Sequence, residues 1–218
     1  MNENKLLVIG DARPIQDCLK AKGYTIEQSD GEEGIERALS GDHALVVLSL
    51  PRPLETLQRI RELSMVPILT LLPTSDDTDR ITCLEQGADD CFDQPCDPRE
   101  LVARVRSIQR RAGRVWPLGE EPTGEVLKAR DLSLDTSSRE VKVSGLPVAL
   151  TGVEFSLLEM LLRASGRPLS REALTRQVLR RRFSPFDRSI DVHISSLRKK
   201  IGAERIHTVR GVGYLFTS

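Results

Sequence analysis

The chain has 218 residues, a hydrophobic fraction of 39% and 32 Lys/Arg against 32 Asp/Glu, so its formal net charge is zero. This length suits two domains of ordinary size. It contains no signal peptide and no apolar run of about 18 residues, so we expect a cytoplasmic protein without a membrane segment.

Charge divides the chain into two unlike halves. Residues 1–113 hold 14 Lys/Arg and 20 Asp/Glu, a net charge of −6, whereas residues 114–218 hold 18 and 12, a net charge of +6. An acidic half joined to a basic half is typical of a nucleic-acid-binding module that carries a second domain.

In the first half, short apolar runs alternate five times with helix-like segments. The runs are 6–9, 24–28, 44–50, 66–72 and 91–92, and the segments are 15–22, 31–39, 54–63, 78–86 and 98–111. This alternation predicts an α/β domain, 1–113, with a parallel sheet covered on both faces. Functional groups of such folds lie at the carboxyl ends of the strands. The residues expected there are Gly10, Asp11, Ser49, Leu72 and Gln94.

Residues 114–124 are rich in Gly, Pro and Glu without an apolar period, which predicts a linker to a second domain at 125–218. Four β-prone runs follow, at 125–129, 132–134, 140–143 and 148–150. Thr151 and Glu154 then form a capping-box pattern that opens an amphipathic helix, and Ser170 caps a second helix that reaches about Leu179.

A third helix, expected over 188–202, carries an apolar stripe at Ile190, Ile194, Leu197 and Ile201. The opposite face presents Arg188, Val192, Ser195 and Lys199, with Ser189 and Ser196 on its flank. Cations, hydroxyls and a small apolar group suit phosphates, base edges and a thymine methyl, so we expect this helix in the major groove of DNA. On its own, an ordinary solvated basic face would be as good an interpretation.

Residues 206–216 read IHTVRGVGYLF and predict a hairpin with Arg210 in its turn. Three helices and a hairpin together make an α+β winged helix-turn-helix. The residues expected to contact double-stranded DNA are Arg188, Ser189, Val192, Ser195, Ser196, Arg198, Lys199, Thr208, Arg210 and Tyr214. The segment 179–187 holds Arg180, Arg181 and Arg182 followed by Phe183 and Phe186, and it suits the DNA backbone as a partner.

The strings IDVHISSLRKKIG and TVRGVGYLF resemble the OmpR/PhoB family of two-component response regulators, and QGADDCFDQPCDPRELVARVRSIQRR extends the resemblance to the first half. The resemblance implies a doubly wound, flavodoxin-like receiver domain, and it implies RNA polymerase as an equal alternative partner of the segment 179–187. Receivers typically use a strand-end aspartate as phosphate acceptor, two acids for magnesium, a hydroxyl and a lysine. At the matching positions this chain has Ser49, the pair Gly10 and Asp11, then Leu72 and Gln94.

Four of those five functional groups are missing, which predicts an atypical receiver that works without phosphorylation. An acyl phosphate needs a carboxylate nucleophile, which a serine hydroxyl without an adjacent base does not replace. Magnesium prefers one or two carboxylates together with phosphate and water. We therefore expect no metal, no other cofactor and no enzymatic activity.

The resemblance also implies an isologous dimer face built from ion pairs. The matching charges are Arg80, Glu85, Asp89, Asp90, Glu100, Arg104, Arg110 and Arg111. A solvated charge run is the plainer alternative. Exposed pairs contribute only about 0–1 kcal/mol each, but complementary signs fix register and partner choice.

The sequence therefore predicts a homodimeric transcriptional regulator that binds paired half-sites about 10–10.5 bp apart. Two alternatives stay open. One is a phosphorylation-switched regulator with Asp11 as acceptor, and the other is a regulator whose receiver senses a ligand or an oxidant through Cys91 and Cys96.

Overall fold

The computed structural model describes residues 2–73, 77–113 and 124–217. The chain forms two compact units, 1–115 and 116–218, and each is described here by itself. The predicted linker, apart from Gly124, lies outside the described residues.

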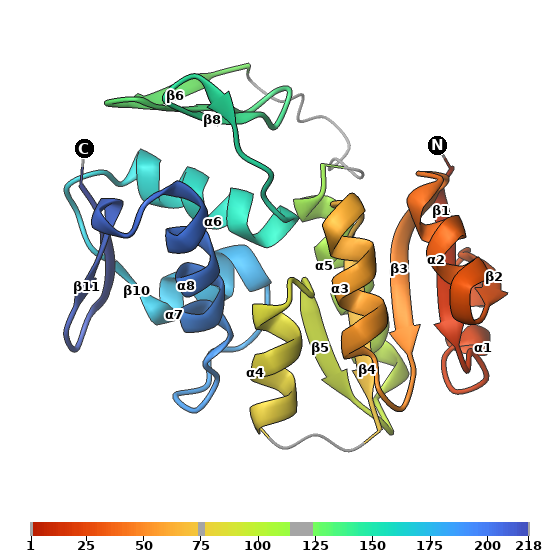
Figure 1. The fold of residues 1–218 in the computed structure, drawn as a ribbon. Helices are drawn as coiled ribbons and strands as arrows, with labels where there is room; N and C mark the ends of the chain where they lie inside the picture. The colour runs from red at the N-terminus through yellow and green to blue at the C-terminus, as the bar shows by residue number, and fades with distance from the viewer. Residues whose placement is uncertain (1, 74–76, 114–123, 218) are drawn as a thin grey trace. The chain divides into compact units, whose positions relative to one another are not determined.

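The first unit is a five-stranded parallel sheet with five helices (Figure 1). Its strands are β1 (Asn2–Gly10), β2 (Thr25–Ser29), β3 (His43–Ser49), β4 (Ile68–Leu72) and β5 (Asp90–Asp93), and its helices are α1 (Gln16–Lys20), α2 (Gly31–Leu39), α3 (Leu54–Leu63), α4 (Asp77–Glu85) and α5 (Pro98–Arg111). The strand order β2-β1-β3-β4-β5 is that of a flavodoxin-like doubly wound fold. The predicted α/β class and the alternation of elements are confirmed.

Helices cover both faces of this sheet, which explains why its strands are continuously apolar rather than alternating. Every residue of β3 is buried. One face packs Leu6, Val8, Leu45 and Val47 against α1 and α5, and α2, α3 and α4 lie over the other face (Figure 1).

The second unit begins with a four-stranded antiparallel sheet of β6 (Val126–Ala129), β7 (Leu132–Asp135), β8 (Val141–Val143) and β9 (Leu146–Pro147). The fourth predicted run, 148–150, lies slightly too late in the chain, because β9 ends at Pro147 and only the Val148 amide continues the pairing, donating to the Val141 carbonyl at 2.8 Å.

Three helical segments follow. They are α6 (Gly152–Arg163), α7 (Arg171–Leu174), which continues as a π-helical turn over Thr175–Leu179, and α8 (Ser189–Ile201). The predicted capping box is present: the Thr151 hydroxyl accepts from the Glu154 amide at 3.3 Å, and the Glu154 carboxylate accepts from the Thr151 amide at 2.8 Å. The Ser170 hydroxyl likewise accepts from the Ala173 amide at 3.1 Å.

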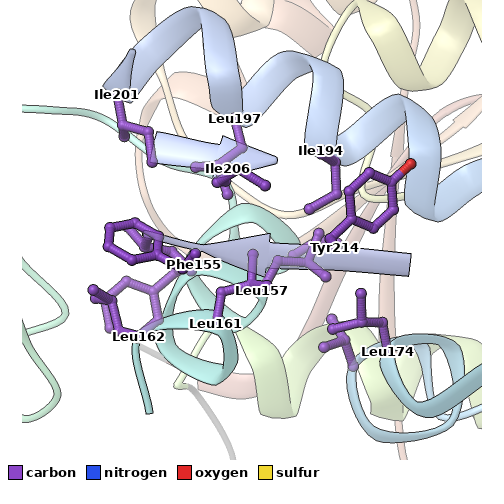
Figure 2. Close-up of a cluster of buried hydrophobic side chains, with 14 of the residues drawn as sticks. Phe155, Leu157, Leu161, Leu162, Leu174, Ile194, Leu197, Ile201, Ile206 and Tyr214 are labelled. Carbon is purple, nitrogen blue, oxygen red and sulfur yellow. The ribbon is translucent and has the colours of Figure 1, made fainter. Parts of the chain in front are cut away.

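The core of this unit lies between α6, α8 and the C-terminal hairpin (Figure 2). The predicted stripe of α8, Ile190, Ile194, Leu197 and Ile201, is buried there, so one face of the helix is fixed by apolar packing. Burying side chains of this size contributes about 1.5–3 kcal/mol each.

The hairpin consists of β11 (Ile206–Val209) and β12 (Gly213–Phe216), and β12 also pairs with β10 (Leu169–Ser170). This third strand was not predicted. It depends on Gly213, where a Cβ atom would stand 2.0 Å from the Leu169 carbonyl oxygen, so only glycine permits the close pairing.

Candidate nucleic-acid interface and receiver site

The surface of α8 that remains exposed is smaller than the sequence predicted. Arg188, Ser195 and Lys199 are exposed, and Ser196 is half-buried. Ser189 and Val192 were expected on the outward side, but they are buried, with 3% and 7% of their surface exposed. The residues before the helix explain Ser189, whose hydroxyl donates to Asp187 at 2.6 Å.

The start of α8 is thus covered by the loop that precedes it. Arg181 donates to the Ser189 hydroxyl at 2.7 Å and pairs with Asp187 at 2.6 Å, which holds the preceding loop against the helix. His193 is also buried. In the same loop, Phe186 is 88% exposed.

The hairpin presents Thr208 and Arg210 to solvent, with Gly211 in the turn at φ +73°. Tyr214 is different, because its ring is buried and its hydroxyl donates to the Asp191 carboxylate at 2.5 Å. Arg198 donates to the Ile206 carbonyl at 2.8 Å and to the Thr208 hydroxyl at 3.0 Å. Arg198 and Tyr214 therefore join the helix to the hairpin.

Two residues of this surface, Arg171 and Asp191, were missed at the level of sequence. Arg171, the first residue of α7, donates to Asp191 at 2.8 Å and lies 5.0 Å from the centre of the Tyr214 ring. The signal was present, since Arg171 directly follows the predicted cap Ser170, but its partner stands 20 residues further along the chain.

In the first unit, the predicted strand-end residues do lie together. The Asp11 amide donates to the Ser49 carbonyl at 3.1 Å, the Gln94 amide donates to the Leu72 carbonyl at 2.8 Å, and the Gln94 side-chain amide lies 3.4 Å from the Ser49 hydroxyl. Gly10 has φ +103°, and a Cβ atom there would stand 2.2 Å from the Ser49 carbonyl oxygen. The backbone needs glycine where typical receivers place an acid.

Asp11 supplies the one carboxylate among these five residues, and Arg13 occupies it. The Arg13 guanidinium donates to both carboxylate oxygens, at 2.9 and 2.8 Å, and the Arg13 amide donates to one of them at 3.0 Å. These hydrogen bonds lower the pKa of Asp11 to about 2. The carboxylate is therefore ionised and already neutralised by a cation of its own chain.

This donor set does not fit magnesium. Ser49 and Leu72 are buried and uncharged, and Gln94 is uncharged, so Asp11 would be the sole anionic ligand. Among the residues that the structure describes, no cluster of three or more His, Cys, Asp or Glu side chains could hold a metal ion. A magnesium ion typically takes one or two carboxylates together with phosphate and water, and the single carboxylate here is already paired with Arg13.

The charges predicted for a dimer face are partly engaged within the chain. Arg104 pairs with Asp90 and with Glu100, both at 2.6 Å, and Arg61 pairs with the buried Asp89 at 3.0 Å. Arg111 is buried and Arg80 pairs with Asp93. The exposed members of the set are Glu85, Glu100 and Arg110.

The cysteines are arranged differently from the pair considered in the sequence. Cys91 in β5 is hydrogen-bonded to Cys83 in α4, and both are buried. The hydrogen bond from Cys91 lowers the pKa of the Cys83 thiol, whereas burial raises the pKa of the Cys91 thiol. Cys96 is partly exposed, and the cysteine that contacts Cys91 is Cys83 rather than Cys96.

In the described ranges, no helix is long and apolar enough to span a bilayer. Family comparison matches residues 145–216 to "Transcriptional regulatory protein, C terminal". The transcriptional regulatory protein CpxR of Klebsiella pneumoniae is 36% identical, with 99% of each chain covered. The transcriptional regulatory protein TrcR of Mycobacterium tuberculosis is 37% identical over 97% of this chain and 86% of the relative. A solved structure, that of a point mutant of RitR, shares the fold with a TM-score of 0.72, 22% identity and 98% coverage of each chain.

A receiver-like α/β unit followed by a winged-helix unit defines a class of two-domain, DNA-binding transcription regulators. Within that class, full-length identity to CpxR and TrcR decides the family. The chain belongs to the OmpR/PhoB family of transcriptional response regulators.

Proposed function

We propose that this regulator dimerises through its receiver without aspartyl phosphorylation and binds paired half-sites in duplex DNA. The observation that carries the proposal is the Arg13–Asp11 ion pair, which engages both oxygens of the one carboxylate at the phosphorylation site. A carboxylate that accepts a phosphoryl group or binds magnesium uses its oxygens for that purpose, and at Asp11 both oxygens already accept hydrogen bonds from Arg13.

Ser49, at the matching acceptor position, supports the same interpretation. Its hydroxyl lies 3.4 Å from the neutral Gln94 side-chain amide, and the residue is 8% exposed. A serine hydroxyl becomes nucleophilic when a base removes its proton, and neither Gln94 nor Leu72 is a base.

A direct experiment adds beryllofluoride or acetyl phosphate to the full-length protein at several magnesium concentrations. The dimer dissociation constant, measured by sedimentation equilibrium, and the affinity for a duplex selected from a random pool should both stay unchanged. A tighter dimer with beryllofluoride, lost in Asp11→Asn, would overturn the proposal and establish a phosphorylation-switched regulator with Asp11 as acceptor.

The dimer face is tested best at its exposed charges, because Arg104 and Asp90 also stabilise the receiver itself. Charge reversal at Glu85 and Arg110 should weaken dimerisation, since each reversal turns a complementary contact into a like-charge one. Glu55→Lys on α3 is the matched control, since it reverses an exposed charge outside α4, β5 and α5. Equal dimer affinity in all three variants would place the interface elsewhere.

The DNA interface comprises the exposed cations of α8 and the hairpin. Lys199 lies on α8, Arg188 directly precedes that helix, and Arg210 lies in the hairpin turn. Such cations bind phosphates and fix the register on the duplex, while the hydroxyls of Ser195 and Ser196 read base edges. Serine discriminates bases less sharply than a bidentate arginine, so shape and the reach of Arg210 into the minor groove contribute to specificity.

A further inference from the structure

A carboxylate stands at the surface that we assign to DNA. Asp191 lies in the first turn of α8, between the exposed Arg188 and the exposed Ser195, and its side chain is 26% exposed. A carboxylate this close to a polyanion costs binding energy through repulsion. Its presence therefore needs a reason other than contact with DNA.

Asp191 connects three segments of the second unit. It accepts a hydrogen bond from the Tyr214 hydroxyl of β12 at 2.5 Å and another from the Arg171 guanidinium of α7 at 2.8 Å. Arg188, just before α8, lies 3.9 Å away. Burial and the Asp191 carboxylate raise the pKa of Tyr214 to about 12, so the hydroxyl keeps its proton and donates it.

A second connection lies two turns further along the same side of α8. Arg198 donates to the Ile206 carbonyl and to the Thr208 hydroxyl of β11, and its guanidinium lies 5.6 Å from the centre of the Tyr214 ring. Residues seven apart share a helix face and are separated by about 10 Å along the axis. The hairpin is therefore attached to α8 at two points rather than one.

We propose that Asp191 is a positioning residue for DNA binding: it holds the Tyr214 hydroxyl and the Arg171 guanidinium against α8, so that Arg210 in the hairpin and Lys199 on α8 reach the duplex together. Fixing two contact surfaces before association reduces the ordering that binding otherwise has to impose. Tyr214 then acts through Asp191. The inference depends on α8 and the hairpin facing DNA, and it does not depend on how the receiver is switched.

Asp191→Asn gives a test in which electrostatics and positioning have opposite signs. The substitution removes a negative charge near the phosphates, so electrostatics alone would tighten binding. It also replaces an ionised acceptor of two hydrogen bonds, and loss of charge-assisted bonds of this kind should weaken binding about tenfold. Glu172→Gln is the matched control, because it removes one exposed carboxylate of α7 that pairs only locally with Arg176.

The full-length protein is titrated with a duplex selected by the wild type from a random pool, and hydroxyl-radical footprints are recorded. Protection that disappears in Arg210→Ala identifies the hairpin contact. In Asp191→Asn we expect weaker binding with that protection reduced and the α8 protection retained, a pattern that general destabilisation would not give. Binding as tight as, or tighter than, that of Glu172→Gln would overturn the proposal.

Tyr214→Phe keeps the test decisive if Asp191→Asn does not fold. This variant removes one hydroxyl, leaves the buried ring in place and changes no charge. It should weaken binding in the same direction, and the double variant should lose less than the two single losses combined, since both remove one interaction. Unchanged affinity in Tyr214→Phe would exclude positioning through Asp191.

Discussion

At the residue scale, Arg13 determines the hydrogen bonding of the Asp11 carboxylate. The sequence predicts Asp11 as a strand-end carboxylate, and nothing in the spacing shows that a residue two positions later takes both of its oxygens. The ion pair between Arg13 and Asp11 depends on the backbone turn that begins at Gly10. Gly10 has φ +103°, a value that is accessible to glycine and strained for other residues. Local sequence therefore identified the site but not the state of its carboxylate.

Arg13→Ala should release Asp11. Because the Arg13 hydrogen bonds hold the pKa of Asp11 at about 2, their loss should return it toward the ordinary value of about 3.9. The side-chain carboxyl signal of Asp11, followed by carbon-detected NMR from acid to neutral pH, measures the change. Arg52→Ala, which removes another exposed arginine, serves as control, and a pKa that stays near 2 in Arg13→Ala would contradict the assigned cause.

A histidine in the first unit predicts acid sensitivity. His43 is buried among Lys5, Glu27, Arg37 and Asp42, and burial together with the Lys5 charge lowers its pKa. Protonation is therefore more favourable in the unfolded chain, whose histidine titrates near 6.5. This contribution to stability is complete above that pH and declines as the pH falls below it.

Urea unfolding of the wild type and His43→Gln between pH 5 and 8, read from the transition of the first unit, measures this dependence. The slope of stability against pH should flatten in His43→Gln. His207→Gln, at an exposed position of β11, should leave the slope unchanged. Parallel curves for all three proteins would mean that other groups cause the acid loss.

At the scale of elements, the sequence predicted what local signals encode. The capping box at Thr151, the cap at Ser170 and the apolar stripe of α8 are all encoded by residues a few positions apart, and the structure has them. Elements set by distant partners were missed. The two residues of β10 form a strand because Gly213 lets β12 approach them closely. The residues around Leu169 show no sequence pattern that predicts this pairing.

Thr151→Ala should destabilise the second unit by about 0.5–2 kcal/mol, the usual cost of removing an N-cap side chain. The Thr151 hydroxyl accepts from the Glu154 amide, and the same carboxylate that completes the box also pairs with Lys200 of α8 at 2.7 Å. Thermal unfolding followed by circular dichroism gives the change, with Thr151→Ser as the control that keeps the cap. A stability loss of similar size in Thr151→Ser would show that the methyl group matters rather than the cap.

At the scale of the whole molecule, composition was informative about partners. Both halves are rich in charge, yet the halves differ in net charge by 12, and the basic one is the winged-helix unit. The apolar periodicity then identified which face of α8 packs against the core, but it takes no account of other segments that cover the rest of the helix. Ser189 and Val192 lie off the stripe and are nevertheless buried, and for Ser189 the reason is the preceding loop, whose Asp187 and Arg181 bind its hydroxyl. Site residues on one element are predictable; those covered by another segment are not.

The remaining cations give a prediction for the complete protein on DNA. Each phosphate contact releases condensed counterions, so log affinity falls with log salt concentration by about 0.9 per contact. Arg210→Ala and Lys199→Ala should each weaken binding to a selected duplex and reduce that slope by about one. Lys128→Ala, which removes an exposed cation of β6, should retain the wild-type slope. Titrations between about 50 and 200 mM salt decide the matter; if Arg210→Ala or Lys199→Ala also retains the wild-type slope, that residue does not contact a phosphate.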